Sequence, residues 1–473
     1  LNIASGATFN SAEGAVRVDA LTGAGSLGLG WTTLGGITTG VNNTAAGAYN
    51  TAGTATFSGV ISANSGVTSG GTFATSGTGT QILTGTNTHT STTIGTGSTL
   101  QVGSGGATGT LGSGAVVDNG ALVFNRDASA DLTVAGAISG TGTVTQSGAG
   151  KIILTGANSY QGATNISAGT LQVGNGSNTG SLGTAGVSVA ANANLSFYRS
   201  DASLSISNAM SGAGAINFMG TGVQGQSGYS LTGASSSFSG SINISQSRLG
   251  LSSASPVGTA AITVNSGAQL WLNGGFTLNN VLSLAGNGWN ESPWGYLGAR
   301  RLQTGANYGG AITLAADARI GAHNDSGTIS GVISGAKNLE INLPADSTGG
   351  TVYLTNSNTY SGTTTVSAGT LQIGNGGTTG TLGTSPTVNN NGTLAFNRSD
   401  NITVDQQITG TGGLTKAGTG TLTLMDSASL NGANNYSGVT TISAGTLQVG
   451  DGGTSGHLGT GNIVDNGNLV IKH

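Results

Sequence analysis

Residues that could act as a hydrolase triad occur once in this sequence. His323 lies in the segment AHNDSG, near Asp317 and Asp325, and Ser is abundant throughout the chain. A G-x-S-x-G elbow, which places the serine on a sharp strand-to-helix turn, would strengthen the case for a Ser–His–Asp triad. The chain has no helical pattern that could form such an elbow. We therefore interpret His323 as a loop residue.

A second group of residues could act on a sugar chain. Asp317 and Arg319 share a face if they lie on a strand, and Glu340 follows about one turn later. Two carboxylates about 5 to 9.5 Å apart can hydrolyse a glycosidic bond. The alternative, which we favour, is an ordinary strand with a surface ion pair worth less than about 1 kcal/mol. A polysaccharide-acting enzyme therefore remains the second candidate function.

The third group is aromatic. Three of the four Trp residues fall within the segment 271–310, and Pro293 indicates a projecting loop there. Exposed Trp and Tyr beside polar and basic groups can stack on sugar rings or anchor a neighbouring protein. The alternative is that the Trp side chains fold back and cap an open edge locally. The predicted ligand or partner contacts are Trp271, Trp289, Trp294, Tyr296, Arg300 and Arg301.

The elements that must position these residues are short strands. Apolar residues alternate with polar ones in brief pulses, as at Ile152 and Leu154 or Leu171 and Val173, and Gly, Asn, Asp or Ser ends each pulse. Such alternation predicts half-buried strands. The chain contains 89 Gly among 473 residues, and each would cost a helix roughly 1 kcal/mol. The sequence therefore predicts an all-β protein.

The strand pulses belong to a repeat. TLQVG occurs at 99–103, 170–174 and 446–450, with TLQIG at 370–374, and the motif LTG-A-N-x-(aromatic)-x-G precedes these segments. The steps of 71 and 76 residues divide into three turns of about 24–25 residues. Pulses this short must stack on copies of themselves. We expect a single-stranded parallel β-helix of about 20 turns with a roughly triangular section.

Two features of the repeat have structural interpretations. One aromatic position recurs, and we expect its side chains to fill the interior; its members are His89, Tyr160, Phe238, Tyr360 and Tyr436. An Arg-Asp turn also recurs, and we expect it to lock the chain rather than to bind a ligand. The turn occurs as Arg126-Asp127, Arg199-Asp201 and Arg398-Asp400.

Composition excludes several other classes. Only 12 residues are basic and the net charge is −4, too few cations to cover a nucleic-acid backbone. No run of 18 apolar residues predicts a membrane-spanning helix. The absence of Cys removes disulfides, thiol nucleophiles and Cys-ligated metals. We predict no cofactor, no metal site and no nucleic-acid partner.

Three stretches of the sequence resemble the passenger-associated repeat of autotransporters, the type V secretion proteins of Gram-negative bacteria. These are GTGTLTL at 418–424, NNYSGVTTISAGTLQVGDGGTSGHLGTGNIVDNGNLV at 434–470 and FNRSD at 396–400. The resemblance implies a right-handed parallel β-helix at the cell surface or outside the cell. It also implies an outer-membrane β-barrel translocator as a partner during secretion. Autotransporters of this family include adhesins, biofilm proteins and enzymes, so the resemblance does not define an activity.

The sequence as a whole predicts a non-catalytic extracellular rod that serves adhesion, biofilm or fibre formation. Its expected partners are a host or biofilm surface, including glycans, and further copies of itself. A passive stalk, or a slice of a longer adhesin, is the remaining alternative. We expect one continuous β-solenoid over residues 1–473. The expected repeat blocks are about 76–150, 151–227, 228–344 (degenerate, with the Trp-rich segment), 345–420 and 421–473 (truncated).

The two ends of the sequence begin and stop in strand pattern. Open strand edges can pair with another chain, and head-to-tail pairing of identical chains builds an open filament. Leu1 and Ile3 of one copy are therefore predicted to lie beside Leu469 and Ile471 of the next. A slice of a longer passenger would present the same pattern, so both interpretations stay open.

Overall fold

The structure is a computed structural model that describes residues 1–11, 15–30, 35–40, 53–64, 71–223, 225–291, 295–322, 324–343, 349–426 and 432–472. The chain forms two compact units. Unit 1 comprises Leu1–Asp201, Ser207–Met219 and Gly233–Ser241, and unit 2 comprises Ala202–Ile206, Gly220–Thr232 and Ile242–His473. A single 3-10 turn, Ser255–Val257, is the only helical element of the described residues. None of the described residues forms a helix that could span a membrane.

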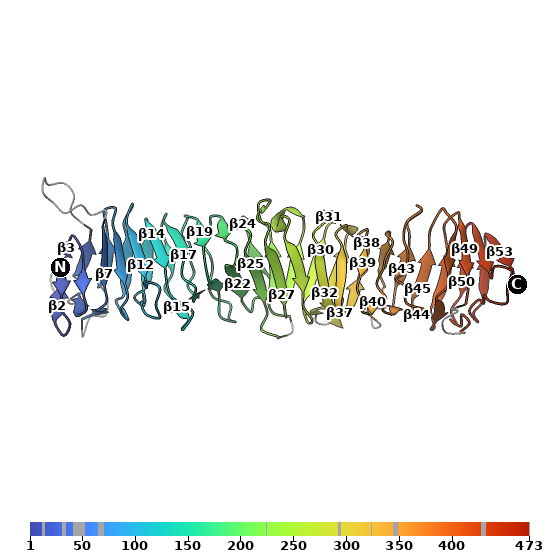
Figure 1. Ribbon diagram of the computed structural model, residues 1–473, viewed down its shortest axis with the longest axis horizontal. Coiled ribbons are helices and arrows are strands. Elements are labelled where there is room, and N and C mark those ends of the chain that lie inside the picture. Colours follow the sequence, from blue (N-terminus) through green and yellow to red (C-terminus); the bar gives the residue numbers. More distant parts are fainter. Residues whose placement is uncertain are drawn as a thin grey trace. The chain divides into compact units, whose positions relative to one another are not determined.

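Unit 1 is built from parallel strands that stack turn upon turn (Figure 1). Its longest sheet runs β1 (Asn2–Ile3), β4 (Thr22–Gly23), β7 (Thr54–Phe57), β10 (Thr80–Leu83), β12 (Thr99–Val102), β14 (Ala121–Phe124), β17 (Thr143–Gln146), β19 (Thr164–Ile166), β21 (Val187–Val189) and β24 (Met210–Gly212). A second runs β16 (Ile138–Ser139), β13 (Ala115–Asp118), β11 (Ser91–Ile94), β9 (Thr72–Thr75), β6 (Gly36–Thr39) and β3 (Ala15–Val18). The remaining walls are β2 (Thr8–Ser11), β5 (Ser26–Leu29) and β8 (Val60–Ala63), and β15 (Leu132–Val134), β18 (Lys151–Leu154), β20 (Thr170–Val173), β22 (Asn194–Tyr198) and β25 (Ala215–Met219).

Unit 2 repeats this parallel architecture. One wall contains β23 (Leu204–Ile206), β26 (Gly228–Leu231), β28 (Arg248–Leu251), β30 (Gln269–Asn273), β35 (Arg300–Gln303), β37 (Ile312–Gly321), β40 (Leu339–Ile341), β42 (Thr364–Val366), β44 (Thr387–Asn390) and β47 (Gln407–Thr409). Beside it lie β27 (Ser241–Ser245), β29 (Ala261–Val264), β32 (Leu282–Gly286) and β39 (Ile333–Ser334).

The other walls of unit 2 are two further parallel sheets. The first is β31 (Thr277–Leu278), β36 (Ala306–Tyr308), β38 (Ser326–Ile329), β41 (Thr351–Leu354), β43 (Thr370–Ile373), β45 (Thr393–Phe396), β48 (Gly413–Lys416), β50 (Thr440–Ile442) and β52 (Ile463–Asp465). The second is β46 (Ile402–Val404), β49 (Thr421–Leu424), β51 (Thr446–Val449) and β53 (Asn468–Ile471). One antiparallel pair, β33 (Asn290–Glu291) and β34 (Gly295–Tyr296), interrupts the pattern.

The register confirms the predicted parallel β-solenoid of about 20 turns. In unit 1, Thr80 pairs with Thr99, Thr99 with Ala121 and Ala121 with Thr143, which gives turns of 19, 22 and 22 residues. These turns are shorter than the 24–25 residues expected, because several corners need only a few Gly, Asn or Ser residues. The division into repeat blocks stays a prediction.

The core consists of inward side chains aligned through successive turns. Leu100 pairs in register with Leu122, and Leu122 with Val144, and all three are buried. Strands of four residues, such as β12 and β43, alternate half-buried and buried positions. Each strand therefore buries only two side chains, and it is stable only because its neighbours in the stack bury the same positions.

Gly ends the TLQVG segments for a steric reason. Gly174 and Gly374 have φ angles of 81° and 77°, which residues with a Cβ rarely adopt. A Cβ on either would also lie 2.6 Å from a carbonyl oxygen of the next turn, that of Tyr198 or Asn397. The corner therefore requires glycine both for its backbone angle and for the close approach of the adjacent turn.

Candidate functional site

The Asn of the repeated motif joins three successive turns. Asn358 is buried; its Oδ1 accepts from the Ile333 N–H at 2.9 Å, and its Nδ2 donates to the Thr381 carbonyl at 2.7 Å. Asn87, Asn158 and Asn434 make the same two bonds to the turns before and after them. A corner that leaves the strand ladder thus keeps its buried backbone groups hydrogen-bonded.

The aromatic or His side chain two residues after this Asn lies inside the solenoid and hydrogen-bonds to a Thr hydroxyl. The hydroxyl of Tyr160 bonds to that of Thr164 at 2.7 Å, and the equivalent pair Tyr360–Thr364 is also 2.7 Å apart. In the first copy the Nε2 of His89 replaces the tyrosine hydroxyl, 2.9 Å from the Thr92 hydroxyl. Burial lowers the pKa of His89 to about 4. The predicted role of these aromatic residues as interior fillers is confirmed by their burial.

Two of the three Arg-Asp turns, Arg199-Asp201 and Arg398-Asp400, lock the chain as predicted. In the third, Arg126 donates to the Gly109 carbonyl at 3.2 Å, while Asp127 accepts from the Ser129 N–H at 3.0 Å. Arg398 donates from Nη1 to the Gly380 carbonyl at 2.6 Å and from Nε to Asp400 at 2.8 Å. Arg199 bonds in the same way to the Gly180 carbonyl and to Asp201. The hydrogen bond from Arg holds the pKa of both carboxyls, Asp201 and Asp400, below its usual value. The Arg and Asp side chains of these two turns are therefore bonded to protein groups, and Arg398 and Asp400 also line a cavity of about 550 Å³.

The Trp-rich segment forms the antiparallel hairpin β33–β34 in unit 2, and a buried charge cluster holds it. Glu291 of β33 pairs with Arg301 and, at 3.3 Å, with Arg248. Its other carboxylate oxygen accepts from the Gln269 side-chain amide at 2.8 Å. The Glu291 side chain is only 4% exposed, so the loss of either cation would leave a buried charge poorly compensated.

Arg248 lies between two Trp rings. Its guanidinium carbon is 4.9 Å from the ring centre of Trp271 and 4.8 Å from that of Trp289. Trp271 also donates from Nε1 to the Gln303 side chain at 3.0 Å. Such cation–π contacts contribute about 0.5–2 kcal/mol each. The two Trp side chains therefore fold against the solenoid rather than project from it.

The six predicted contact residues are in different situations. Trp289 and Arg301 are largely buried, and Trp271 is half-buried. Arg300 is fully buried, lies over the Tyr308 ring at 4.8 Å, and has its pKa lowered by burial to about 9. Only Tyr296, at 46% exposure, projects to solvent. Trp294 lies outside the described residues. A ligand-contact role for this set stays a prediction.

A groove of about 210 Å³ lies beside the hairpin. Asn290 and Tyr296 are direct partners across β33–β34, so their side chains emerge on the same face. The described residues that line it are Gly222, Val223, Gln246, Gly267, Trp289, Asn290 and Tyr296.

The sequence did not predict three residues of this region. Arg248 belongs to the charge cluster, and Gln246 and Val223 line the groove. All three lie in turns that precede the Trp-rich segment. Arg248 pairs in register with Gln269, one turn later. The residues one turn before Trp271 include Arg248. Because the turns differ in length, the sequence alone does not show which residues pair between them.

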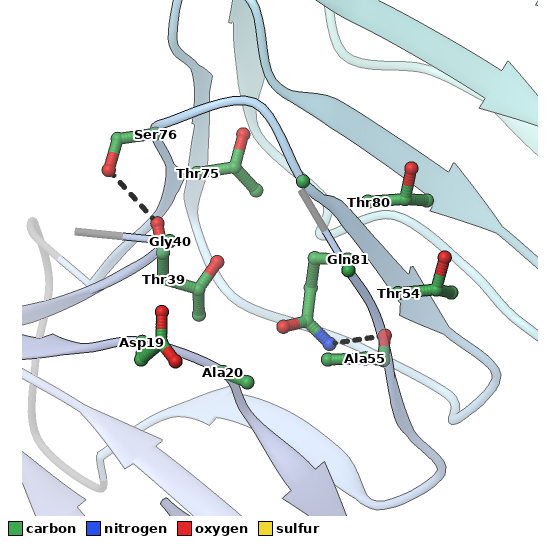
Figure 2. A pocket seen from close by; sticks show the side chains of 12 residues that line it. Asp19, Ala20, Thr39, Gly40, Thr54, Ala55, Thr75, Ser76, Thr80 and Gln81 are labelled. Atoms are coloured by element: carbon green, nitrogen blue, oxygen red, sulfur yellow. Dashed lines mark hydrogen bonds between the residues drawn. The ribbon is translucent and has the colours of Figure 1, made fainter. Parts of the chain in front are cut away.

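A smaller cavity of about 160 Å³ lies at a corner of unit 1, where β3, β6 and β9 end and β7 and β10 begin (Figure 2). Asp19, several Thr hydroxyls and the Gln81 amide surround it. Gln81 donates to the Ala55 carbonyl at 3.1 Å, and the Ser76 hydroxyl donates to the Thr39 carbonyl at 3.1 Å. These two side chains bond to adjacent turns, whereas Asp19 Oδ1 is buried without a hydrogen bond to the described residues. We interpret the cavity as a polar corner of the solenoid.

The predicted carboxylate pair is tied to protein groups. Glu340 pairs with Arg319 at 2.8 Å, while Asp317 accepts from the backbone and side-chain amides of Asn338 at 2.9 and 3.0 Å. His323 lies outside the described residues. Within the described part of the chain, no three His, Cys, Asp or Glu side chains gather as a metal site requires.

Comparison with known proteins identifies the repeat. A family model described as passenger-associated-transport-repeat matches residues 73–102, 144–173, 349–373 and 414–449. The chain carries passenger-associated transport repeats. Each matched segment contains one Asn that bonds to the turns before and after it. Each also contains the buried aromatic or His position two residues later. The transport-repeat motif therefore coincides with these bonds between turns.

One curated relative is an autotransporter adhesin. The chain is 32% identical over 445 residues to the adhesin BmaC autotransporter of Brucella suis biovar 1 (strain 1330), with 73% of this chain aligned. The chain spans 13% of the length of that relative. No solved structure matches the chain. The resemblance to autotransporter passengers predicted from the sequence is confirmed.

Of the residues proposed for axial contacts, Leu1 precedes β1, Ile3 lies on β1, and Leu469 and Ile471 lie on β53; β1 and β53 are end strands of their sheets. Ile3 of β1 is buried against β4, while Leu1 is 38% exposed. Leu469 and Ile471 belong to β53, which pairs with β51, and Ile471 is 65% exposed. Head-to-tail pairing through these residues stays a prediction.

Proposed function

We propose that this chain is a non-catalytic segment of a secreted autotransporter passenger with an adhesin-like role. Its place would be the outer cell surface, or the space outside the cell, of a Gram-negative bacterium. The observation that carries the proposal is the 32% identity over 445 residues to an autotransporter adhesin. The transport repeats add support, because they belong to passengers that are moved across the outer membrane.

The chemistry of the described residues favours binding over catalysis. General acid–base catalysis needs a group free to exchange a proton with a substrate. The best-placed carboxylates, Asp317 and Glu340, instead accept hydrogen bonds from Asn338 and Arg319. A polysaccharide-acting enzyme remains the alternative, and a passive stalk the second alternative.

The partners follow from this role. During secretion the passenger would pass through an outer-membrane translocator. After secretion, the flat polar walls and the hairpin of unit 2 would contact a host or biofilm surface. Fibre formation by self-association is a finer version of the same proposal. It would use lateral walls or the strands that carry Leu1, Ile3, Leu469 and Ile471.

The test is adhesion by the purified chain. Beads coated with the folded 473-residue protein should bind host-cell monolayers saturably, and soluble protein should compete. Beads coated with heat-unfolded protein are the control. Binding no better than that of albumin-coated beads would contradict an adhesin-like role and favour the stalk. Release of reducing ends from a polysaccharide panel would overturn the non-catalytic assignment.

A further inference from the structure

We propose that the groove beside the β33–β34 hairpin binds one ring of a neutral sugar. The proposal deepens the adhesin-like function above and rests on it. It names the class of ligand that this face of unit 2 would recognise. The groove is lined by Val223, Gln246, Trp289, Asn290 and Tyr296, together with two glycines.

The β33–β34 hairpin has one face packed against the solenoid and one face that borders the groove. Side chains alternate along a strand, so Glu291 points inward to Arg248 and Arg301 while Asn290 points the other way. Asn290 is the cross-strand partner of Tyr296. The exposed Tyr296 ring on this face can stack on the C–H face of a sugar.

The corner opposite the hairpin is open for a backbone reason. Gln246 is exposed and has a φ angle of 52°, in the left-handed region. Gly222 and Gly267 lie on either side of it; a Cβ on Gly222 would be 3.5 Å from the Gln246 Oε1, and one on Gly267 would be 4.0 Å from its Cγ. Strained residues cluster at binding sites. Because neither neighbour has a side chain, the Gln246 amide stays accessible beside the groove.

The charges around the groove favour a neutral ligand. None of the described residues that line it carries a charge. The carboxylate of Glu291, which follows Asn290 in the chain, is buried and paired with Arg248 and Arg301. Arg248 is paired with Glu291, and its guanidinium lies against the rings of Trp271 and Trp289. An acidic sugar would therefore find no unpaired cation in the described lining, whereas a hydroxyl could bond to the exposed Gln246 amide.

Size and rigidity limit the ligand to a single ring. The groove measures about 210 Å³, below the roughly 300–1,000 Å³ typical of pockets for drug-sized ligands. The hairpin is fixed on its inner side, because Arg319 donates to the Tyr296 carbonyl at 2.6 Å and Glu291 is held by its ion pairs. A preorganised face loses little entropy on binding.

The experiment is a fluorescence titration of the full chain, which uses the Trp289 indole in the groove as reporter. The neutral ligands are the methyl glycosides of glucose, galactose, mannose and N-acetylglucosamine; glucuronate and sialic acid are the acidic ones. We expect a saturable change with at least one neutral glycoside. Tyr296→Ala should weaken it about tenfold, and Gln246→Ala about fivefold.

Tyr353→Ala, in β41 on the regular wall, is the matched control and should bind like the parent chain. Thermal melting should be unchanged in Tyr296→Ala, because that side chain is half exposed. Saturation by acidic sugars alone, or by none of the panel, would overturn the proposal. Equal affinity of Tyr296→Ala and Tyr353→Ala would overturn it as well.

The two proposals fail separately. If beads adhere to cells but no sugar binds, the adhesin-like function stands and the sugar site is wrong. If a neutral glycoside binds but beads do not adhere, the site stands and the adhesin-like function is wrong. The same glycoside should then be tested as a competitor of bead adhesion to host cells and, separately, to surfaces coated with biofilm polysaccharide. The surface on which it competes shows whether the natural sugar belongs to the host or to the biofilm.

Discussion

At the residue scale, Asp118 is a carboxylate in a hydrophobic interior. It ends β13, is fully buried, and accepts only the Gly120 N–H at 3.0 Å among its described hydrogen bonds. Burial raises its pKa from 3.8 to about 6. The corresponding residue of a later repeat, Asn390, instead donates to the Gly413 carbonyl at 2.9 Å. The same corner thus exists in a charged and a neutral version.

We predict that Asp118→Asn stabilises the protein at neutral pH by about 1–2 kcal/mol. A raised pKa in the folded state means that Asp118 stabilises most below pH 3.8 and that this contribution is lost as pH rises to about 6. The difference between variant and parent should therefore be small at acidic pH and grow across that window. Urea unfolding at a series of pH values measures it.

Asn390→Asp is the matched opposite. It should destabilise the chain at neutral pH and less so at acidic pH, since it buries a carboxylate at the equivalent corner. Parallel stability curves for Asp118→Asn and the parent chain from acidic to neutral pH would show that Asp118 has an ordinary pKa.

At the element scale, the Asn that joins three turns is the feature to test. Asn358→Ala would leave the Ile333 N–H and the Thr381 carbonyl without their side-chain partner. Each unsatisfied buried group costs about 1–3 kcal/mol, so we expect a loss of about 2–5 kcal/mol in unfolding free energy. Chemical denaturation measures the loss. Hydrogen exchange should show it concentrated at the corners on both sides of Asn358.

The control for this prediction is Asn178→Ala. That side chain is exposed, so it should change the unfolding free energy by less than about 0.5 kcal/mol. Equal effects of the two substitutions would mean that the bonds made by Asn358 have no special weight.

At the scale of the whole molecule, stability should depend on keeping whole turns. Thr370 of β43 pairs in register with Thr393 of β45. Deletion of residues 370–392 would bring Thr393 to the place of Thr370 and keep Leu394 and Phe396 pointing inward, where Leu371 and Ile373 were. In a stack of nearest-neighbour turns such an excision costs one interface. We expect a cooperative melt, lowered in temperature, and an unchanged circular dichroism spectrum.

Deletion of residues 370–380 tests the reverse case. It removes β43 but not a whole turn, so the following strands lose their partners on two walls. We expect loss of the cooperative melt. If both deletions melt alike, register between turns does not control the fold of this unit.

Much of this architecture follows from the sequence alone. The period-two pulses around Leu171 and Leu371 predicted strands, and their recurrence predicted parallel stacking, because a local pattern that repeats places the same residue on the same wall each time. The buried aromatic position at Tyr160 and Tyr360 followed from the same periodicity. Turn lengths did not, since a corner can shorten without changing any strand pattern.

The sequence alone therefore determined the strands, the repeat and the interior positions. Only the tertiary structure decided the groove and its charge cluster. Arg248 and Glu291 are 43 residues apart, and an antiparallel hairpin with no counterpart in the regular repeat brings them together. No local period encodes that contact. The contact between Arg248 and Glu291 depends on the lengths of the unequal turns between them. It also depends on pairing with cations, which allows the Glu291 carboxylate to be buried.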